Sequence, residues 1–376
     1  MRKIYNCVLL CILAEVFPSG ASAGEIIAIK ADRIDTVTSG VIQNGIIIID
    51  DGRIKAIGND IQIPETAKVI EATDKTIFPG LLNPATRVGL TRPSTDGPAS
   101  NPQYRVIDEL YPNQDQYKRV LKAGFTTIGL LPSDSSRSQG VTGQGAVIRP
   151  IGQNPEEMII TESGFVMIYF QASDKVEKII KSALDSAKSK TDSTDPKVKP
   201  LIEALQGRVP IFVMYDLPGE VLHLIKLLEP YEKLKLVLVA GTETHLIAKE
   251  LAKKKIPVIV PSQIDFERNT LNRINIPRML NEAEVQIALK PESDNVRGYE
   301  DFLRQVAELV KYGLDRKVAK KAITINPAEI MLIDYRLGSL DIGKDANLLI
   351  LSGDPLDIGT KIDKVMIEGK IVYEAL

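Results

Sequence analysis

The stretch TINPAEIMLIDYRLGSLDIGKDANLLILSGDPL, residues 324–356, holds the features from which the fold can be worked out. Leu348 to Leu351 is a short apolar run, and the turn residues Ser352-Gly353-Asp354-Pro355 follow it directly. Gly, Asp and Pro favour a tight turn because they tolerate or preset the backbone angles that turns need. Further on, residues 364–373 contain two β-rich runs separated only by Glu368-Gly369. These patterns predict a series of short strands at this end of the chain.

The other end of the chain shows the same pattern. Asp50-Asp51-Gly52 separates two runs rich in β-branched residues, and Asp-Gly accepts the positive φ of a tight hairpin turn. The strands expected there are Glu25 to Lys30, Ile42 to Ile49, Arg53 to Ile57 and Lys68 to Glu71. Because the termini of a domain often lie close together, we expect the two strand-rich ends to form one small β domain.

Strand and helix patterns alternate between the two ends. The expected strands are Phe125 to Leu130, Val209 to Tyr215, Lys235 to Val239, Ile256 to Val260 and Val285 to Leu289. The expected helices are Gln114 to Ala123, Pro218 to Leu228, Glu243 to Lys254 and Tyr299 to Lys311. Strands that alternate with helices of this length form a parallel sheet through right-handed crossovers.

The alternation fails from Leu131 to Phe170. Short strands are expected at Ala146 to Arg149, Met158 to Thr161 and Phe165 to Phe170, with no helix of useful length between them. We therefore expect a strand pair to replace ordinary βα units here, which would leave the sheet distorted or incomplete.

Residues 1–23 have the three parts of a secretory signal. Arg2 and Lys3 precede an apolar stretch, and Ala21-Ser22-Ala23 forms a cleavage site, so Gly24 would begin the mature chain. The chain is thus expected to be exported, to the periplasm or the extracellular space. Glu15 interrupts the apolar stretch and leaves a buried strand or an uncleaved anchor as the alternatives.

Composition excludes several classes of function. Lys and Arg total 47 against 49 Asp and Glu, so no basic excess indicates a nucleic-acid partner or an anionic membrane surface. Both cysteines lie within residues 1–23, so the mature chain could form no disulfide and no thiolate metal site. No span of the mature chain is apolar for long enough to cross a membrane.

Several segments together resemble the amidohydrolase superfamily, in particular its exported branch similar to imidazolonepropionases. They are Ile77 to Leu82, which resembles the lead-in to a first barrel strand, Leu121 to Thr127, Thr324 to Ala328, Leu337 to Asn347, and Ser352 to Leu356. The resemblance implies an α/β fold with a TIM-like (β/α)8 barrel at residues 80–334. It also implies a β-sandwich domain composed of residues 24–79 and 335–376.

Active members of this superfamily hold one or two divalent metals, and the resemblance assigns the ligand positions. The paired histidines of the first strand fall on Ala85 and Arg87, and the preceding aspartate falls on Asn83. The histidine of the fifth strand falls on Met214 or Tyr215, and that of the sixth strand on Ala240 or Gly241. The aspartate of the eighth strand, which would move a proton in active members, falls on Asp294. No lysine can be assigned as a metal bridge.

The histidine count decides against the metal centre. The family site takes four histidines, whereas the whole chain has two, His223 and His245, each in a predicted helix rather than at an inward strand end. A surface or helix-packing role fits each of them better than a ligand role. We therefore expect no metal and no other cofactor.

Arg87 stands out among the remaining residues. A guanidinium in place of a metal ligand would return positive charge to the barrel mouth, where it could pair with Asp294 or hold an anionic ligand. The alternative is that Arg87 points into solvent from a loop displaced by Pro84. Tyr215, Thr242 and Glu243 follow predicted strand ends, so they are expected, with Asn83, to line a ligand site at the mouth.

Two functions are compatible with these residues. The favoured one is an exported amidohydrolase-like protein that has lost its metal site and binds a small molecule or a partner. The partner would be a second copy of the chain or an intact relative. The alternative is an active hydrolase of amide or cyclic amide C–N bonds that uses a non-standard site or a site completed by another chain.

The run Lys253-Lys254-Lys255 ends a helix and indicates a solvated face.

Overall fold

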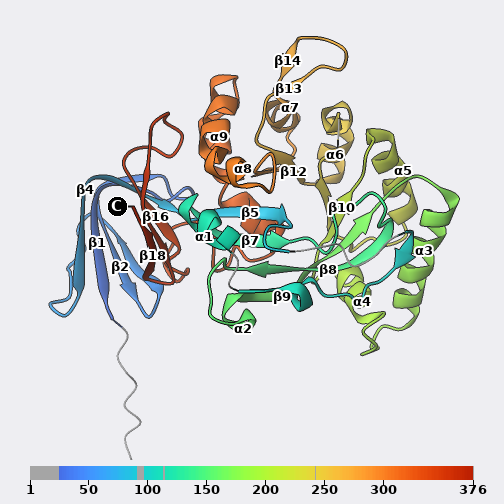
Figure 1. Ribbon diagram of the computed structural model, residues 1–376, viewed down its shortest axis with the longest axis horizontal. Helices are drawn as coiled ribbons and strands as arrows, with labels where there is room; N and C mark the ends of the chain where they lie inside the picture. The colour runs from blue at the N-terminus through green and yellow to red at the C-terminus, as the bar shows by residue number, and fades with distance from the viewer. Residues whose placement is uncertain (1–24, 91–96, 113–114, 242, 376) are drawn as a thin grey trace, which may run out of the picture.

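The computed structural model describes residues 25–90, 97–112, 115–241 and 243–375. A β-sheet assembled from both ends of the chain lies beside a barrel built from its middle (Figure 1). The predicted signal at residues 1–23 lies outside the described residues and stays a prediction. Within the described part, no helix combines the length and apolar character that a membrane crossing requires.

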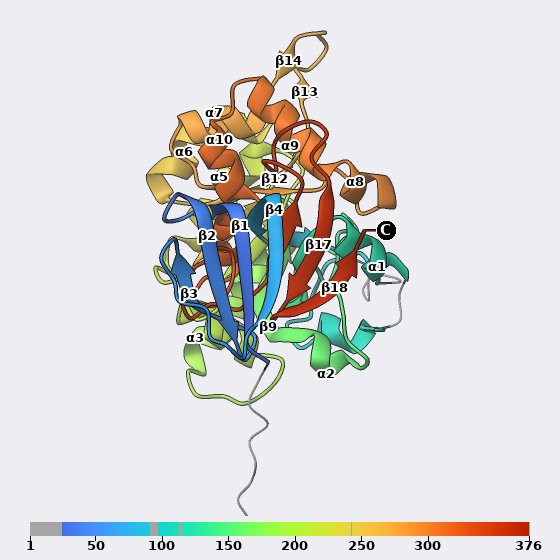
Figure 2. The same ribbon diagram turned by 90° about the vertical axis from the view of Figure 1, so that its left-hand side faces the viewer.

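The terminal sheet has seven strands in the order β18-β17-β16-β4-β1-β2-β3, so strands from opposite ends of the sequence are neighbours (Figure 2). Its strands are β1 (Ile27–Asp35), β2 (Val41–Asp50), β3 (Arg53–Gly58), β4 (Lys68–Pro79), β16 (Leu348–Leu351), β17 (Ile362–Ile367) and β18 (Lys370–Glu374). The two ends meet where β16 pairs antiparallel with β4, Leu348 opposite Pro79. Isoleucines such as Ile29, Ile47 and Ile77 form its core. The face-to-face stacking of two sheets that a β-sandwich requires stays a prediction.

The second sheet curls into a nearly closed barrel of eight strands in the order β15-β12-β11-β10-β9-β8-β7-β5. Its strands are β5 (Leu81–Thr86), β7 (Phe125–Leu130), β8 (Gly140–Ile148), β9 (Ile159–Tyr169), β10 (Ile211–Met214), β11 (Leu236–Val239), β12 (Val258–Pro261) and β15 (Ile287–Lys290). The short β6 (Ala99–Ser100) pairs with β8, and β13 (Asp265–Phe266) pairs with β14 (Arg273–Ile274) in a separate hairpin.

The strand β8 departs from a regular TIM barrel. It runs antiparallel to both β7 and β9, while the other neighbouring pairs of the barrel are parallel. The expected replacement of βα units between Leu131 and Phe170 is therefore confirmed. β9 is one continuous strand where the sequence predicted two, because its residues pair with β8 along most of its length.

Helices cover the outside of the barrel, and apolar side chains fill its inside. The helices are η1 (Val106–Glu109), α1 (Asp115–Lys122), α2 (Pro155–Met158), α3 (Asp174–Ser189), α4 (Lys199–Leu205), α5 (Pro218–Leu228), η2 (Thr244–Ile247), α6 (Ala248–Lys254), α7 (Ile276–Glu282), α8 (Val296–Glu300), α9 (Phe302–Lys311), α10 (Arg316–Ala322) and α11 (Ile325–Ile330). Alternate strand residues face inward, and among them the rings of Phe165 and Phe212 stack with centroids 3.9 Å apart. The apolar interior makes the barrel a packed core rather than a channel.

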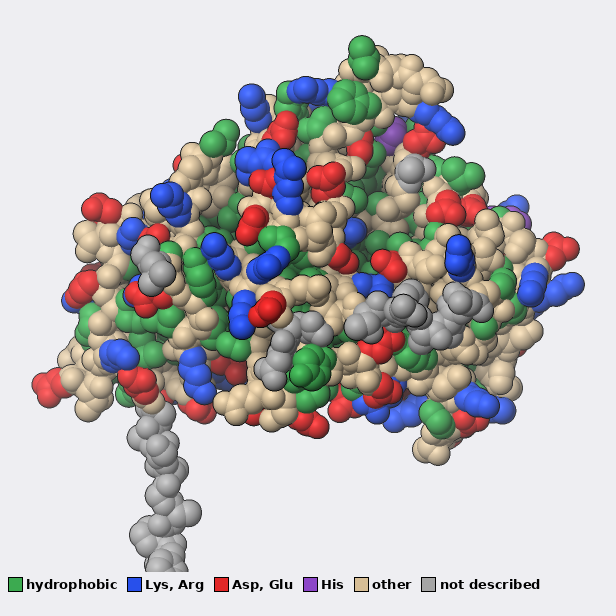
Figure 3. Space-filling model, in the orientation of Figure 1, with side chains coloured by type: hydrophobic (Ala, Val, Ile, Leu, Met, Phe, Trp, Pro, Cys, Tyr) green, Lys and Arg blue, Asp and Glu red, His purple; other side chains and the backbone are tan. Residues whose placement is uncertain are grey.

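A buried ionic network joins the terminal sheet to the barrel. The Lys320 ammonium on α10 donates to Asp35 Oδ2 at 2.7 Å and to Asp354 Oδ2 at 2.6 Å. Arg33 and Arg316 also donate to the Asp354 carboxylate, at 3.0 and 2.6 Å. The turn after β16 therefore places Asp354 as an acceptor for three cations that come from both parts of the molecule. On the face seen in Figure 3, acidic and basic side chains are otherwise interspersed.

We expect Gly129→Ala to lower the free energy of unfolding by about 1–3 kcal/mol, because a small-to-large change overpacks the core. A Cβ at Gly129 on β7 would lie 2.4 Å from the backbone oxygen of Pro84, where the pairing of β5 with β7 shifts register. Gly219→Ala on α5 is the matched control, since nothing lies within 4 Å of its Cβ position. Urea unfolding of both variants measures this. Equal stability of the two variants would show that β5 shifts readily to make room for the added methyl group.

Candidate functional site

Three of the predicted site residues, Asn83, Arg87 and Asp294, meet at the carboxyl end of the barrel. Asp294 follows β15, and its Oδ1 accepts a hydrogen bond from Thr86 Oγ1 at 2.7 Å. Its Oδ2 accepts one from the Arg87 backbone N–H, also at 2.7 Å. Both oxygens of this carboxylate are therefore used to hold the end of the first barrel strand.

Tyr299 on α8 extends this hydrogen-bond network. Its hydroxyl accepts from Asn83 Nδ2 at 2.9 Å and lies 2.9 Å from Thr86 Oγ1. Because the single hydroxyl proton of Thr86 is donated to Asp294, the Tyr299 hydroxyl is the donor to Thr86. Burial raises the pKa of Tyr299 well above its usual value, and the nearby Asp294 carboxylate adds to the effect, so the phenol keeps its proton.

These side chains close the barrel. β15 and β5 are the two ends of the sheet, and among the described residues no backbone ladder joins them, although they lie against each other. Asp294 and Tyr299 supply bonds across this seam through side chains instead. A buried, fully bonded network of this kind fixes one arrangement of the strands.

The Arg87 guanidinium is buried rather than directed into solvent, with 8% of its side chain exposed. Its Nη1 donates to the backbone oxygens of Leu131 and Pro132 at 2.7 and 2.6 Å. Its Nη2 lies 3.3 Å from Glu109 Oε2, and its Nε lies 3.8 Å from Asp134 Oδ1. The expected pairing of the guanidinium with Asp294 is wrong. Asp294 accepts a hydrogen bond from the backbone N–H of Arg87, and the carboxylate that pairs with the guanidinium is that of Glu109 in η1.

Tyr215 and Glu243 lie apart from this group. Tyr215 directly follows β10 and is buried on the helix-facing side of the barrel. Its hydroxyl lies 2.6 Å from Thr244 Oγ1, and burial raises its pKa to about 12. The inner face at this strand end holds Met214. Glu243 has a φ of 57° and forms an ion pair with Arg268 at 3.9 Å. Thr242 lies outside the described residues.

Comparisons with known proteins agree with this architecture. Residues 210–372 match the model described as "Amidohydrolase family". A solved amidohydrolase from Thermotoga maritima MSB8 superposes with a TM-score of 0.81 at 25% identity, covering 93% of this chain and all of that one. Residues 210–372 thus match the amidohydrolase family, and the chain as a whole shares the fold of a solved amidohydrolase.

Two further proteins similar to this chain are a deaminase and a prolidase. A 5'-deoxyadenosine deaminase from Methanosphaera stadtmanae is 23% identical over 314 residues, covering 81% of this chain and 72% of that protein. A prolidase complexed with N-methylphosphonate-L-proline has a TM-score of 0.60 at 14% identity, covering 93% of this chain and all of that one, a level that supports the fold alone.

The donor atoms that a superfamily metal centre needs are missing from this mouth. The first-strand positions hold Ala85 and the buried cation Arg87, and the inner faces of the fifth and sixth strands end in Met214 and Val239. Within the described ranges, no group of three or more His, Cys, Asp or Glu side chains is placed to hold a metal ion. Arg87 is a cation that already pairs with Glu109 and Asp134, and the Ala85 side chain offers no donor atom, so these residues do not fit the group.

The two histidines lie elsewhere. His223 on α5 is half exposed, and its Nε2 lies 2.9 Å from Glu177 Oε1. His245 lies in η2, just after the sixth barrel strand, and its buried Nδ1 has no hydrogen-bond partner in the part of the chain that the structure describes.

Sequence reasoning missed Thr86, Glu109 and Tyr299. Thr86 lies between two quoted positions, and strand alternation alone gives no reason to single it out. Asn295 is the signal for Tyr299, because its side chain accepts from Gly298 N–H at 2.9 Å and so begins α8. The helical pattern in the sequence predicted a helix that begins at Tyr299, which placed the tyrosine at its edge.

Proposed function

We propose that this chain is an exported, metal-free member of the amidohydrolase superfamily that has lost the family's hydrolytic mechanism. It would serve as a ligand-binding or partner subunit, and the motifs at residues 77–82 and 337–347 favour the branch similar to imidazolonepropionases. The observation that carries the proposal is the use of Asp294. Its two oxygens bind Thr86 and Arg87 at 2.7 Å each, so the carboxylate serves the barrel seam.

The surroundings of Arg87 support the same conclusion. In an active member this position supplies a neutral imidazole to a metal, whereas here it supplies a cation with its own carboxylate and carbonyl partners. The charge at the mouth is thus balanced without a metal ion. Pairing with a second copy or with an intact relative would leave the chemistry to the other chain and use this one for binding.

One observation favours the alternative, an active C–N hydrolase with a non-standard site. The buried Nδ1 of His245 lacks a partner among the described residues, and Asp265 follows the next barrel strand. Burial raises the pKa of Asp265, and the hydrogen bond from Gln263 and the proximity of His245 offset part of this rise. An imidazole and a carboxyl group at neighbouring strand ends are groups that could move a proton in amide hydrolysis.

The proposal predicts that the exported protein, purified without chelator, retains zinc, iron, manganese and nickel far below one equivalent per chain. Elemental analysis measures this, and added Zn²⁺ should leave the melting temperature unchanged. One tightly held equivalent of metal would contradict the proposal and would require ligands at positions other than those that the resemblance assigns.

The active-hydrolase alternative predicts turnover of an amide or cyclic amide. His245→Gln should abolish this turnover, and His223→Gln should preserve it.

A further inference from the structure

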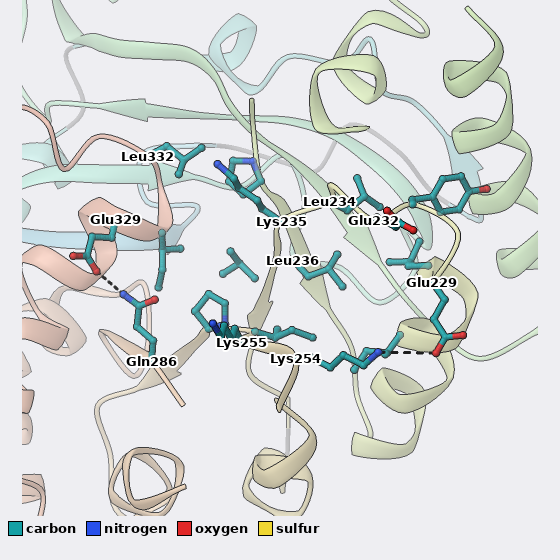
Figure 4. A pocket seen from close by; sticks show the side chains of 18 residues that line it. Glu229, Glu232, Leu234, Lys235, Leu236, Lys254, Lys255, Gln286, Glu329 and Leu332 are labelled. Atoms are coloured by element: carbon teal, nitrogen blue, oxygen red, sulfur yellow. Dashed lines mark hydrogen bonds and ion pairs between the residues drawn. The ribbon is translucent and has the colours of Figure 1, made fainter. Parts of the chain in front are cut away.

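A groove of about 500 Å³ opens at the amino end of the barrel, opposite the mouth (Figure 4). It lies where β10, β11, β12 and β15 begin, and helices α5, α6 and α11 contribute to its walls. None of its lining residues belongs to the Asp294 and Arg87 network. The volume is within the range of ~300–1,000 Å³ that small-molecule sites occupy in proteins.

The floor of this groove is apolar. The lining residues include Leu228, Leu236, Ile256, Pro257, Ile330 and Leu332. Several of them are nearly inaccessible, so the groove is backed by the packed core of the barrel rather than by mobile side chains. Leu236, Pro257 and Leu332 keep part of their surface accessible, and an apolar body placed here would remove that surface from water.

Charged side chains stand at the edge of the floor. Figure 4 shows Lys235 and Lys255 on opposite sides of it, and in the described part of the chain neither ammonium group has an ion-pair partner. Lys254 lies 4.0 Å from Glu229, and Glu329 accepts a hydrogen bond from Gln286 Nε2 at 2.5 Å. Glu232 is the lining carboxylate without such a contact, and it lies towards the Glu229 side of the groove.

The backbone at Lys255 adds a second observation. Lys255 caps α6 with a φ of 53°, a left-handed conformation that usually selects glycine at the end of a helix. A lysine held in this conformation projects from the turn between α6 and β12, directly at the groove. The last lysine of the run Lys253-Lys254-Lys255 thus lines the groove and remains exposed, as the sequence indicated for this run.

We propose that this groove binds a small amphipathic carboxylate, with its apolar body on the floor and its carboxylate between Lys235 and Lys255. Two ammonium groups without partners favour an anion, and the floor selects one with an apolar tail. The proposal is independent of whether the mouth is catalytic, because the two sites lie at opposite ends of the barrel.

Calorimetric titration of the full chain with octanoate tests the proposal. We expect octanoate to saturate a single site and octylammonium, which has the same tail and the opposite charge, to give no saturable binding. Lys235→Met with Lys255→Met should weaken octanoate binding about fivefold or more, because both charge contacts are lost while the apolar stems remain.

Lys253→Met is the matched control, because Lys253 is an exposed lysine of the same helix that does not line the groove. It should bind octanoate like the unaltered protein. Non-saturating uptake of octanoate, equal binding of octylammonium, or unchanged affinity in the double variant would each overturn the proposal. Unchanged melting temperatures would show that the variants fold, since all three lysines are exposed.

Discussion

Replacement of Lys320 by Met is expected to lower the free energy of unfolding by about 3–5 kcal/mol, because it removes one partner of a buried ion pair. Only 8% of Lys320 is exposed, and its ammonium lies between the carboxylates of Asp35 and Asp354 at 2.7 and 2.6 Å. Without it, Asp35, 4% exposed, keeps a charge with one more distant cation, Arg33, at 3.7 Å. Urea unfolding at neutral pH measures the loss.

Lys321→Met on the same helix is the control, since Lys321 is exposed, and its effect should stay within about 0.5 kcal/mol.

The dependence of unfolding free energy on acid pH is a second test of the same ion pair. Burial would raise the pKa of Asp354, but the bonds from Lys320, Leu356 N–H and Arg316 outweigh it and lower the pKa. The stability from this group is therefore present above the ordinary carboxyl pKa of about 4 and lost as pH falls through the lowered value. The two proteins should converge in acid, and a constant difference would contradict the ionic explanation.

The Asp354 turn illustrates what the sequence could predict. Ser352-Gly353-Asp354-Pro355 predicted a turn after a strand correctly, because turn preferences are local. Its meeting with Lys320 depends on how α10 packs against the terminal sheet, and no local pattern contains that information. The antiparallel β8 was predictable for a similar reason, since the absence of helices between Leu131 and Phe170 is itself a local observation.

The residues at the barrel mouth show the same difference between what local patterns predict and what depends on packing. Asn83, Arg87 and Asp294 were placed together because the ends of barrel strands meet at one edge. The partner of the Arg87 guanidinium was not predictable, because Glu109 lies in a one-turn helix far from any quoted motif. Tyr215 shows how sensitive a strand end is to register: a shift of one residue exchanges the inner face, which Met214 occupies, for the helix-facing side.

Arg87→Met is expected to cost about 3–5 kcal/mol of the free energy of unfolding, as for the loss of one partner of a buried pair. The substitution leaves the oxygens of Leu131 and Pro132 without their donor and leaves the Glu109 carboxylate, 20% exposed, without its cation. Arg87→Lys should recover only part of the loss, because a single ammonium cannot bond both carbonyls and the carboxylate in the geometry of the guanidinium fork. Urea unfolding measures both variants.

Arg105→Met is the matched control, since Arg105 precedes η1, is 43% exposed and forms longer ion pairs with Asp108 and Glu162, at 3.8 and 3.4 Å. It should cost less than about 1 kcal/mol. Adding Glu109→Gln to Arg87→Met should restore part of the stability, because the uncompensated charge is then gone and the two changes share one contact. A cost for Arg87→Met no larger than that of the control, with no recovery in the double variant, would mean that the guanidinium does not hold the mouth together. In that case the charge at this position would be free for a ligand, and the first-strand end would again be a candidate for binding an anion.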